Sequence, residues 1–342
     1  MTQATTKTRY AILGFGLHAS RRLVPAFAAS TESVLTGLWR RNPQTAADDA
    51  RQLNIHSYTT PEELCADPNI DTIFITSPDV LHLDHARIAF AHGKAVLCEK
   101  PLAMNAGQAA EIQSLASAAN AGAGAILGVG QNFRFNLSVE YLRAQIAAGA
   151  IGTPLLAHTQ YCYPGHLSAR TWISDPTIAC GGPIADVGVH CIDSLRFILD
   201  TEVKSISALT AKDDPASKVE TLTTMQLHMC SGVFANVTCT TRSPYRTLIE
   251  ITGTEGVLIA ENAFSVEAPV EITLRKSGVI IHTHTVSNAG GYTRMIDAFS
   301  RSLQSDTTTQ PVFTPTGQDA VINQRILDAA YRSAHSGLRE LL

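Results

Sequence analysis

The sequence predicts an α/β first half built on a parallel sheet, followed by an α+β second half with mainly antiparallel strands. From residue 9 to about residue 130, short apolar runs alternate with helix-like segments, as in a parallel sheet wrapped by helices. Beyond residue 131, apolar residues recur at every second position in several stretches, as in strands that bury one face. The length of 342 residues fits about two domains of roughly 150 residues each.

Five apolar runs in the first half are expected to be strands. They lie at residues 10–13, 34–39, 72–76, 95–98 and 126–129. Two of the helices between them have clear starts. Asn42 precedes Pro43, and Thr60-Pro61-Glu62-Glu63 has the pattern of a capping box. Such side chains satisfy backbone amides that an open helix end leaves unpaired.

The second half is expected to begin with a helix at 138–148 that ends at Gly149. Strands are predicted at residues 225–229, 233–237, 247–252, 256–260, 270–274 and 279–284. A helical pattern at 318–340 closes the chain, and we expect this helix to pack back on the first domain. The predicted domains are therefore 1–130 and 131–342.

Composition narrows the class of protein. Thirty acidic against 26 basic residues give a net charge of −4 without a basic block, which argues against nucleic acid as a partner. No apolar run approaches the roughly 20 residues that span a bilayer, and the polar start lacks a signal peptide, so we expect a cytoplasmic protein. The seven cysteines form no C-x-x-C pair, which favours reduced thiols and gives little support to a zinc site.

A glycine turn follows the first predicted strand and precedes a helix-like segment. It reads Gly14-Phe15-Gly16-Leu17-His18-Ala19. Gly14 permits the tight turn, Gly16 lets the backbone approach a pyrophosphate, and Ala19 keeps the helix close to the sheet. We therefore predict that residues 14–17 bind a dinucleotide. The alternative is that the glycines only form a turn.

The residues after the second strand bear on the choice of cofactor. An acidic side chain there would bind the adenosine ribose and select NAD, but the sequence has Trp39-Arg40-Arg41. A guanidinium can grip a 2′-phosphate through its planar fork. The sequence thus favours NADP over NAD without excluding NAD. The alternative is that Arg40 and Arg41 are solvated surface charges.

Two further loops should reach the cofactor, because the carboxyl ends of parallel strands share one edge of the sheet. Thr76-Ser77-Pro78 ends one strand, with His82 about a turn later, and Glu99-Lys100 ends the next. All six residues are predicted cofactor contacts. His82 has an equal alternative, in which a helix residue bonds a nearby carbonyl.

Lys100 is also the first candidate catalytic residue. Pro101 removes an amide donor and restricts the backbone before it, so this turn should fix the direction of the lysine. An ammonium group here can stabilise negative charge that develops on a substrate oxygen during hydride transfer. The alternative is an ordinary surface lysine.

Asp186 and His190 are the other catalytic candidates. They are four residues apart at the start of an amphipathic helix, so helical geometry would place them on one side. A histidine titrates near neutrality and can take a hydroxyl proton, while a carboxylate orients its ring. The alternative is a helix-capping aspartate beside a satisfied core histidine.

The glycine turn, Glu99-Lys100-Pro101 and residues 186–190 together resemble the Gfo/Idh/MocA family of oxidoreductases. The likeness covers nearly the whole chain, and residues 131–135, 149–152 and 172–176 also look like family segments. The resemblance implies an N-terminal Rossmann domain and a C-terminal α+β domain whose large open sheet forms homodimers or homotetramers. It also implies that Lys100, Asp186 and His190 meet over the nicotinamide.

The resemblance further implies a sugar, polyol or related cyclic alcohol as substrate, reacting at a secondary or anomeric hydroxyl. Candidates for the substrate pocket are Arg134, Tyr163, His166 and Trp172, because an aromatic beside polar groups suits a carbohydrate. Tyr163 and Trp172 could equally be core or interface residues.

The sequence therefore predicts an NAD(P)-dependent dehydrogenase or reductase. Two alternatives remain. One is a cofactor-binding regulator without turnover, which could dispense with Lys100 and His190. The other is a redox-assisted glycosidase, in which hydride is removed and later returned. His18 is unusual within the glycine turn, and no role follows for it from the sequence.

Overall fold

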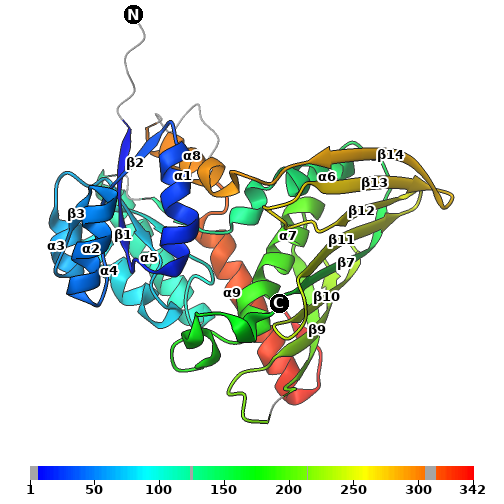
Figure 1. Cartoon of the computed structure of the whole chain (residues 1–342). Coiled ribbons are helices and arrows are strands. Elements are labelled where there is room, and N and C mark those ends of the chain that lie inside the picture. Colours follow the sequence, from blue (N-terminus) through cyan, green and yellow to red (C-terminus); the bar gives the residue numbers. More distant parts are fainter. Residues whose placement is uncertain (1–6, 124–125, 214, 305–312) are drawn as a thin grey trace, which may run out of the picture. The chain divides into compact units, whose positions relative to one another are not determined.

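The computed structural model describes residues 7–123, 126–213, 215–304 and 313–342, so residues 1–6 of the polar start lie outside the described residues. The chain divides into two compact units (Figure 1). The first comprises Met1–Gly130 and Tyr292–Ile322, and the second comprises Gln131–Gly291 and Asn323–Leu342. The segment that begins at Tyr292 thus belongs with the first unit, although it lies far beyond residue 130.

The first unit contains a six-stranded parallel sheet in the order β3-β2-β1-β4-β5-β6. The strands are β1 Thr8–Leu13, β2 Ser33–Trp39, β3 His56–Ser57, β4 Thr72–Ile75, β5 Ala95–Cys98 and β6 Leu127–Val129. The predicted parallel sheet is confirmed, and five of its strands match predicted runs closely. The sixth, β3, was not predicted because two residues carry no recognisable pattern.

Two helices of this unit begin directly after capping residues. The helices are α1 Val24–Ala29, α2 Pro43–Leu53, α3 Pro61–Ala66, α4 His82–Ala91, α5 Ala106–Ala123 and α8 Gly291–Gln304. Asn42 accepts the amide of Thr45 at 3.1 Å, and Thr60 accepts that of Glu63 at 3.1 Å. Glu63 in turn accepts the amide of Thr59 at 3.0 Å. The predicted starts of α2 and α3 are therefore confirmed.

Four strands of the first unit, β1, β4, β5 and β6, are buried along nearly their whole length. Ile73, Ile75 and Val96 belong to one apolar cluster with residues of α4 and α5. The hydroxyl groups of Tyr10 in β1 and Ser300 in α8 share a hydrogen bond of 3.0 Å. Because the strands are held from both faces, the loops at their carboxyl ends start from a rigid base.

The second unit contains a nine-stranded sheet in the order β14-β13-β12-β11-β7-β10-β9-β8-β15. The strands are β7 Pro154–Cys162, β8 Val203–Ala211, β9 Leu222–Met229, β10 Phe234–Thr240, β11 Arg246–Gly253, β12 Val257–Glu261, β13 Val270–Lys276, β14 Val279–Val286 and β15 Glu340–Leu341. Only β7 and β10 pair in parallel. The expectation of a large, mainly antiparallel sheet is confirmed, while β7, β8 and β15 were missed.

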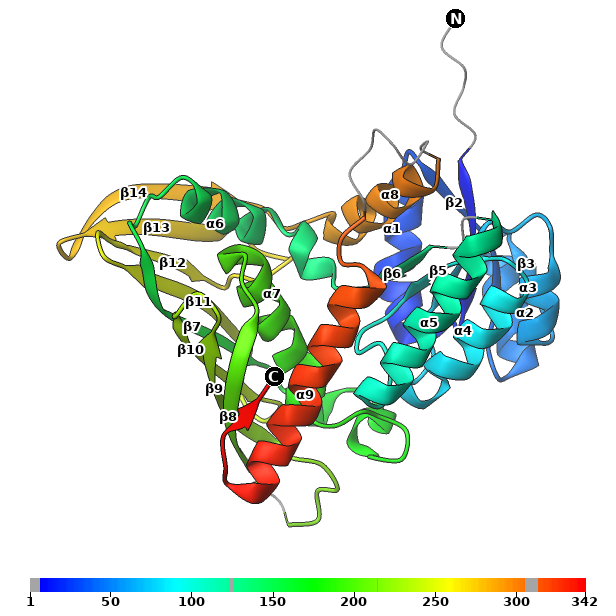
Figure 2. The same ribbon diagram turned by 180° about the vertical axis from the view of Figure 1, so that it is seen from behind.

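Helices pack against one face of this sheet (Figure 2). They are α6 Leu137–Ala147, α7 Val189–Leu199 and the part of α9 (Gly317–Ser336) from Asn323 onward. The predicted last helix does not reach residue 340. It ends at Ser336 because Gly337 takes a positive φ of 73°, which is the usual left-handed helix stop. Among the described helices, none is long and apolar enough to cross a bilayer.

Candidate active site

Gly14 is required by the geometry of the turn that follows β1. Its φ is +99°, and a Cβ built on it would lie 2.4 Å from the amide nitrogen of Ser77. Its carbonyl accepts the Thr76 hydroxyl at 3.0 Å, while its amide donates to the Trp39 carbonyl at 3.0 Å. The turn is therefore tied to the ends of β2 and β4, and no other residue type fits there without displacing Ser77.

Gly16 differs, because no atom in the described part of the chain lies close enough to require a glycine at this position. A Cβ built on Gly16 would have only the carbonyl oxygen of Gly14 nearby, at an ordinary contact distance of 3.8 Å. The space beside its backbone is open. A dinucleotide pyrophosphate needs this close approach to the second glycine of such a turn, so the turn fits that group. Gly14, Phe15, Gly16 and Leu17 would hold it.

The residues expected to select the cofactor lie at the end of β2. One terminal nitrogen of Arg40, Nη1, donates to Asp49 Oδ2 at 2.5 Å. The indole nitrogen of Trp39 donates to the Thr59 carbonyl at 3.2 Å, and Arg41 is exposed. Asp49 therefore holds Arg40 in place at the end of β2, and selection of the cofactor by Arg40 remains a prediction.

His82 lies in the interior of the first unit, 1% exposed. Its Nε2 lies 2.8 Å from the Ser77 carbonyl, and its Nδ1 lies 3.1 Å from the Pro101 carbonyl. The structure thus favours the carbonyl-bonded alternative over the predicted cofactor contact. Through these bonds His82 joins the loop after β4 to the loop after β5.

Ser77 and Pro78 follow β4 on the same side of the sheet as the glycine turn. The Ser77 hydroxyl lies 2.9 Å from Nδ1 of His85. Burial, with a smaller contribution from the charge of His82, lowers the pKa of His85 to about 4. His85 is therefore a neutral partner for Ser77 near pH 7, and it gives this loop a second anchor besides His82.

Glu99 and Lys100 follow β5 directly. The carboxylate of Glu99 is buried, and its Oε2 accepts the amide of Lys100 at 3.2 Å. Its Oε1 lies 3.1 Å from Nε2 of His18 in the glycine turn. Burial alone would raise the pKa of Glu99, but the charge and hydrogen bond of His18, together with Lys100, hold this pKa below its usual value.

Asp186 lies in the second unit, in a π-helical turn at Ile184–Gly188 that runs into α7. Its carboxylate accepts a short hydrogen bond from the hydroxyl of Tyr163, and Arg170 Nη2 lies 3.6 Å from its Oδ2. Burial and the charge of Asp186 raise the pKa of Tyr163, so this tyrosine stays a hydrogen-bond donor. In this structure the hydroxyl of Tyr163, a predicted substrate contact, is hydrogen-bonded to the carboxylate of Asp186.

His190 follows one turn later, in the first turn of α7, and is 6% exposed. Its ring stacks on Phe133 with the centroids 4.2 Å apart. Phe133 itself stacks on Phe264 at 4.6 Å. This aromatic stack holds the plane of the imidazole, whereas an orienting bond from Asp186 to His190 remains a prediction.

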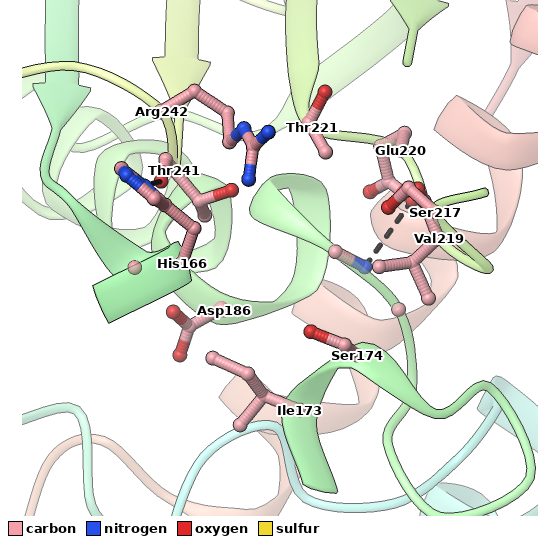
Figure 3. A pocket seen from close by; sticks show the side chains of 13 residues that line it. His166, Ile173, Ser174, Asp186, Ser217, Val219, Glu220, Thr221, Thr241 and Arg242 are labelled. Carbon is pink, nitrogen blue, oxygen red and sulfur yellow. Dashed lines mark hydrogen bonds between the residues drawn. The ribbon is translucent and has the colours of Figure 1, made fainter. Parts of the chain in front are cut away.

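A recess of about 60 Å³ in the second unit contains Asp186. It is lined by Gly165, His166, Ile173, Ser174, Gly181, Gly182, Asp186, Ser217, Val219, Glu220, Thr221, Thr241 and Arg242. In Figure 3, His166 and Thr241 lie on one side with Asp186 below them, and Ser217 and Glu220 lie on the opposite side. Within the described ranges, no group of three His, Cys, Asp or Glu side chains could hold a metal ion.

Most of these lining residues were not found from the sequence. His166 was predicted, and its Nδ1 lies 3.2 Å from the Thr241 carbonyl. Arg242 was missed, although its guanidinium points into the recess (Figure 3) while its Nε donates to Asp213 at 2.5 Å. No sequence pattern marks Arg242, since the recess forms only when loops from distant strands meet.

Glu220 fixes the segment that leads to Asp186. Its Oε2 accepts the amide of Gly182 at 3.2 Å, and its Oε1 accepts the amide of Ile184 at 3.1 Å and the hydroxyl of Tyr331 at 2.8 Å. A Cβ on Gly182 would lie 2.2 Å from the carbonyl oxygen of Glu220. The glycine in this position is therefore required by packing.

Arg134, expected to contact substrate, is instead occupied in the interior of the second unit. Its Nε and Nη2 donate to the two carboxylate oxygens of Asp193 at 2.8 and 2.7 Å, and both side chains are buried. Such a bidentate pair must stay together because either charge alone would be costly to bury. We therefore leave Arg134 out of the candidate site. Trp172 is half-buried, in a short 3₁₀ turn with the recess residues Ile173 and Ser174.

The first unit, with its glycine turn at the carboxyl edge of a parallel sheet, defines a dinucleotide-binding domain. Comparison with known families agrees. Residues 8–129 match the model "Oxidoreductase family, NAD-binding Rossmann fold", and residues 139–259 match the "GFO/IDH/MocA C-terminal domain". The chain belongs to the Gfo/Idh/MocA family of oxidoreductases.

Individual relatives match most of the chain. D-xylose 1-dehydrogenase (NADP(+)) 2 of Haloferax volcanii is 28% identical over 96% of this chain and 98% of its own. The 1,5-anhydro-D-fructose reductase of Ensifer adhaerens is 30% identical over 79% of this chain and 80% of its own. The crystal structure of aldose-aldose oxidoreductase from Caulobacter crescentus, in complex with glycerol, superposes with a TM-score of 0.87 at 23% identity. It covers 98% of this chain and 100% of that one, which shows a shared fold.

Proposed function

We propose that this oxidoreductase transfers hydride between a nicotinamide cofactor and a secondary or anomeric CH–OH group of a sugar or polyol. The observation that carries most weight is the polar recess around Asp186, whose lining of carboxylate, imidazole, hydroxyl and guanidinium groups suits a polyhydroxylated substrate. The printed names of two relatives, a xylose dehydrogenase and an anhydrofructose reductase, support a sugar.

Side chains of the protein would accept the substrate's hydroxyl proton and stabilise the negative charge that develops on its oxygen. When bound, the cofactor supplies the hydride acceptor. In the oxidative direction His190 takes the hydroxyl proton of the substrate, and Lys100 stabilises the negative charge on that oxygen as its carbon gives up hydride. Asp186, held by Tyr163 and Arg170, supports the imidazolium that results. The products are a carbonyl compound and reduced cofactor, and the reduction reverses each transfer.

A panel of sugars and polyols, assayed with each nicotinamide cofactor by absorbance at 340 nm, tests this proposal. We expect cofactor reduction with at least one sugar or polyol. Tight cofactor binding without turnover over the whole panel would instead favour a regulator. Substrate consumption without stable release of reduced cofactor would favour a redox-assisted glycosidase.

Replacing Arg40 by alanine is expected to weaken the binding of NADPH more than the binding of NADH. The reason is that a 2′-phosphate loses a charge-assisted hydrogen bond worth about 1.5–3 kcal/mol, whereas a 2′-hydroxyl loses little. Titration of the purified protein with both cofactors measures the ratio of the two dissociation constants, which should change by roughly tenfold or more. Arg51→Ala, an exposed arginine on α2, is the matched control. Equal effects on both cofactors would refute NADP selection by Arg40.

We also propose that the protein forms a homodimer or homotetramer through the face of the nine-stranded sheet that the helices leave open. Phe234 is 59% exposed there and pairs in register with Leu156, which is 55% exposed. Phe234→Asp should therefore weaken self-association by roughly 30-fold or more, as loss of a central aromatic contact does. Light scattering coupled to gel filtration measures the mass. Phe234→Leu is the control, and a wild-type monomer would contradict the proposal.

A further inference from the structure

His18 and Glu99 join two segments of the first unit that are 81 residues apart in the sequence. His18 belongs to the glycine turn, between β1 and the helical segment after it, and Glu99 follows β5. Nε2 of His18 lies 3.1 Å from Oε1 of Glu99. The histidine side chain is 30% exposed and the glutamate side chain 11%, so the pair lies at the edge of the interior.

The carboxylate of Glu99 is enclosed by its surroundings. Its Oε2 accepts the backbone amide of Lys100 at 3.2 Å. A Cβ on Gly130 would lie only 3.1 Å from the carboxylate, so the Gly130 backbone closes one side. Tyr292 stands edge-on to the His18 ring, with the centroids 5.5 Å apart. Within the described part of the chain, His18 is the side chain that hydrogen-bonds this carboxylate.

A carboxylate oxygen only accepts hydrogen bonds, so His18 must carry the proton on Nε2. The donor can then hold Oε1 in one position, and the geometry of the carboxylate places Oε2 toward the amide of Lys100. Without His18, Oε1 would lose its side-chain donor in a place that water reaches poorly. Rotation of the carboxylate would then release the amide at the start of the turn that carries the lysine.

We propose that His18 is a positioning residue for the reaction proposed above. It holds the Glu99 carboxylate, which in turn holds the backbone of Lys100, and it thereby couples the cofactor-binding glycine turn to the turn that presents the lysine. This inference rests on the proposed function for its catalytic consequence, whereas the His18–Glu99 coupling itself stands on the geometry of the first unit.

The titration of Glu99 reports on this coupling without any turnover. Burial favours the neutral carboxyl, while His18 and Lys100 favour the carboxylate and keep its pKa low. A group whose folded pKa is lowered is most stabilising above its unfolded pKa and loses this contribution as the pH falls through the folded value. Removing His18 takes away a group that lowers the pKa of Glu99, while burial still raises it. The pKa of Glu99 should therefore rise.

The experiment compares His18→Ala with His18→Gln, which keeps a donor on a similar length of side chain. Carboxyl ¹³C NMR of the protein without cofactor follows Glu99, whose resonance is assigned by its loss in Glu99→Gln. We expect a raised Glu99 pKa in His18→Ala and a smaller rise in His18→Gln. We also expect kcat to fall by about tenfold or more in His18→Ala, as displacement of a catalytic group does, with partial recovery in His18→Gln. His92→Gln, an exposed histidine at the end of α4, is the control.

The dissociation constant of NADPH separates positioning from simple damage to the turn. It should change by less than about threefold, which is below 1 kcal/mol, while kcat falls.

An unchanged kcat and Glu99 pKa in a folded His18→Ala protein would overturn the inference, as would equal losses of kcat in the alanine and glutamine variants. If the wild-type protein turns over no sugar or polyol, the proposed function fails. A raised Glu99 pKa in His18→Ala would still support the coupling of the two turns, and an unchanged pKa would refute it.

Discussion

Lys100→Ala is expected to lower kcat by roughly 10²- to 10³-fold, which is the usual effect of removing one donor that stabilises a developing oxyanion. The cofactor should still bind with an affinity near that of the wild type. The reason is that the residues proposed to hold the dinucleotide, in the glycine turn and in the loop after β4, do not depend on the ammonium group. The loss should therefore appear in the chemical step.

Single-turnover kinetics with saturating cofactor measure this step directly, and a separate titration gives the dissociation constant of the cofactor. Lys204→Ala removes an exposed lysine from β8 and serves as the matched control. If turnover of Lys100→Ala equals that of Lys204→Ala, the lysine has no part in the mechanism. If Lys100→Ala instead loses cofactor affinity in proportion to kcat, its role is binding.

The two glycines of the dinucleotide turn are expected to respond oppositely to alanine. Gly14→Ala should destabilise the protein by roughly 2–4 kcal/mol, because it combines an unfavourable backbone conformation with a clash against Ser77. Gly16→Ala should leave stability unchanged or raise it by less than about 1 kcal/mol, because its Cβ enters open space and restricts the unfolded chain. Gly16→Ala should instead reduce the affinity for the cofactor by about tenfold or more.

Urea unfolding without cofactor measures the first difference, and titration with NADPH measures the second. Each variant is the control for the other, since both add one methyl group to the same turn. Full cofactor affinity in a stable Gly16→Ala protein would show that no pyrophosphate approaches this residue. A Gly14→Ala protein as stable as the wild type would contradict the tight contact with Ser77.

Features set by neighbouring residues could be predicted from the sequence. The caps at Asn42 and Thr60 depend on amides three residues away, and the glycine turn depends on the φ that Gly14 permits. Apolar periodicity likewise predicted the parallel first sheet and most strands of the second. These signals are readable because each depends on one short stretch of chain.

The partners of several predicted site residues could not be predicted, because these contacts join distant segments of the chain. Arg134 pairs with Asp193, 59 positions away, and Tyr163 pairs with Asp186, 23 positions away. Nothing in the local sequence distinguishes an arginine that meets substrate from one that meets a buried carboxylate. The same holds for His82, whose two carbonyl partners come from loops after different strands.

The sequence by itself determined the glycine turn, the alternating first half, the placement of Lys100 after β5 and of Asp186 and His190 around the start of α7, and the family that these motifs indicate. Local backbone preferences and apolar periodicity act within a few residues, so they can be read along the chain. The tertiary structure alone decided that Glu220 anchors the Asp186 segment, that Arg242 lines the recess, and that His18 meets Glu99. Those contacts depend on which distant loops the packed sheets bring together, and no short stretch of sequence encodes that choice.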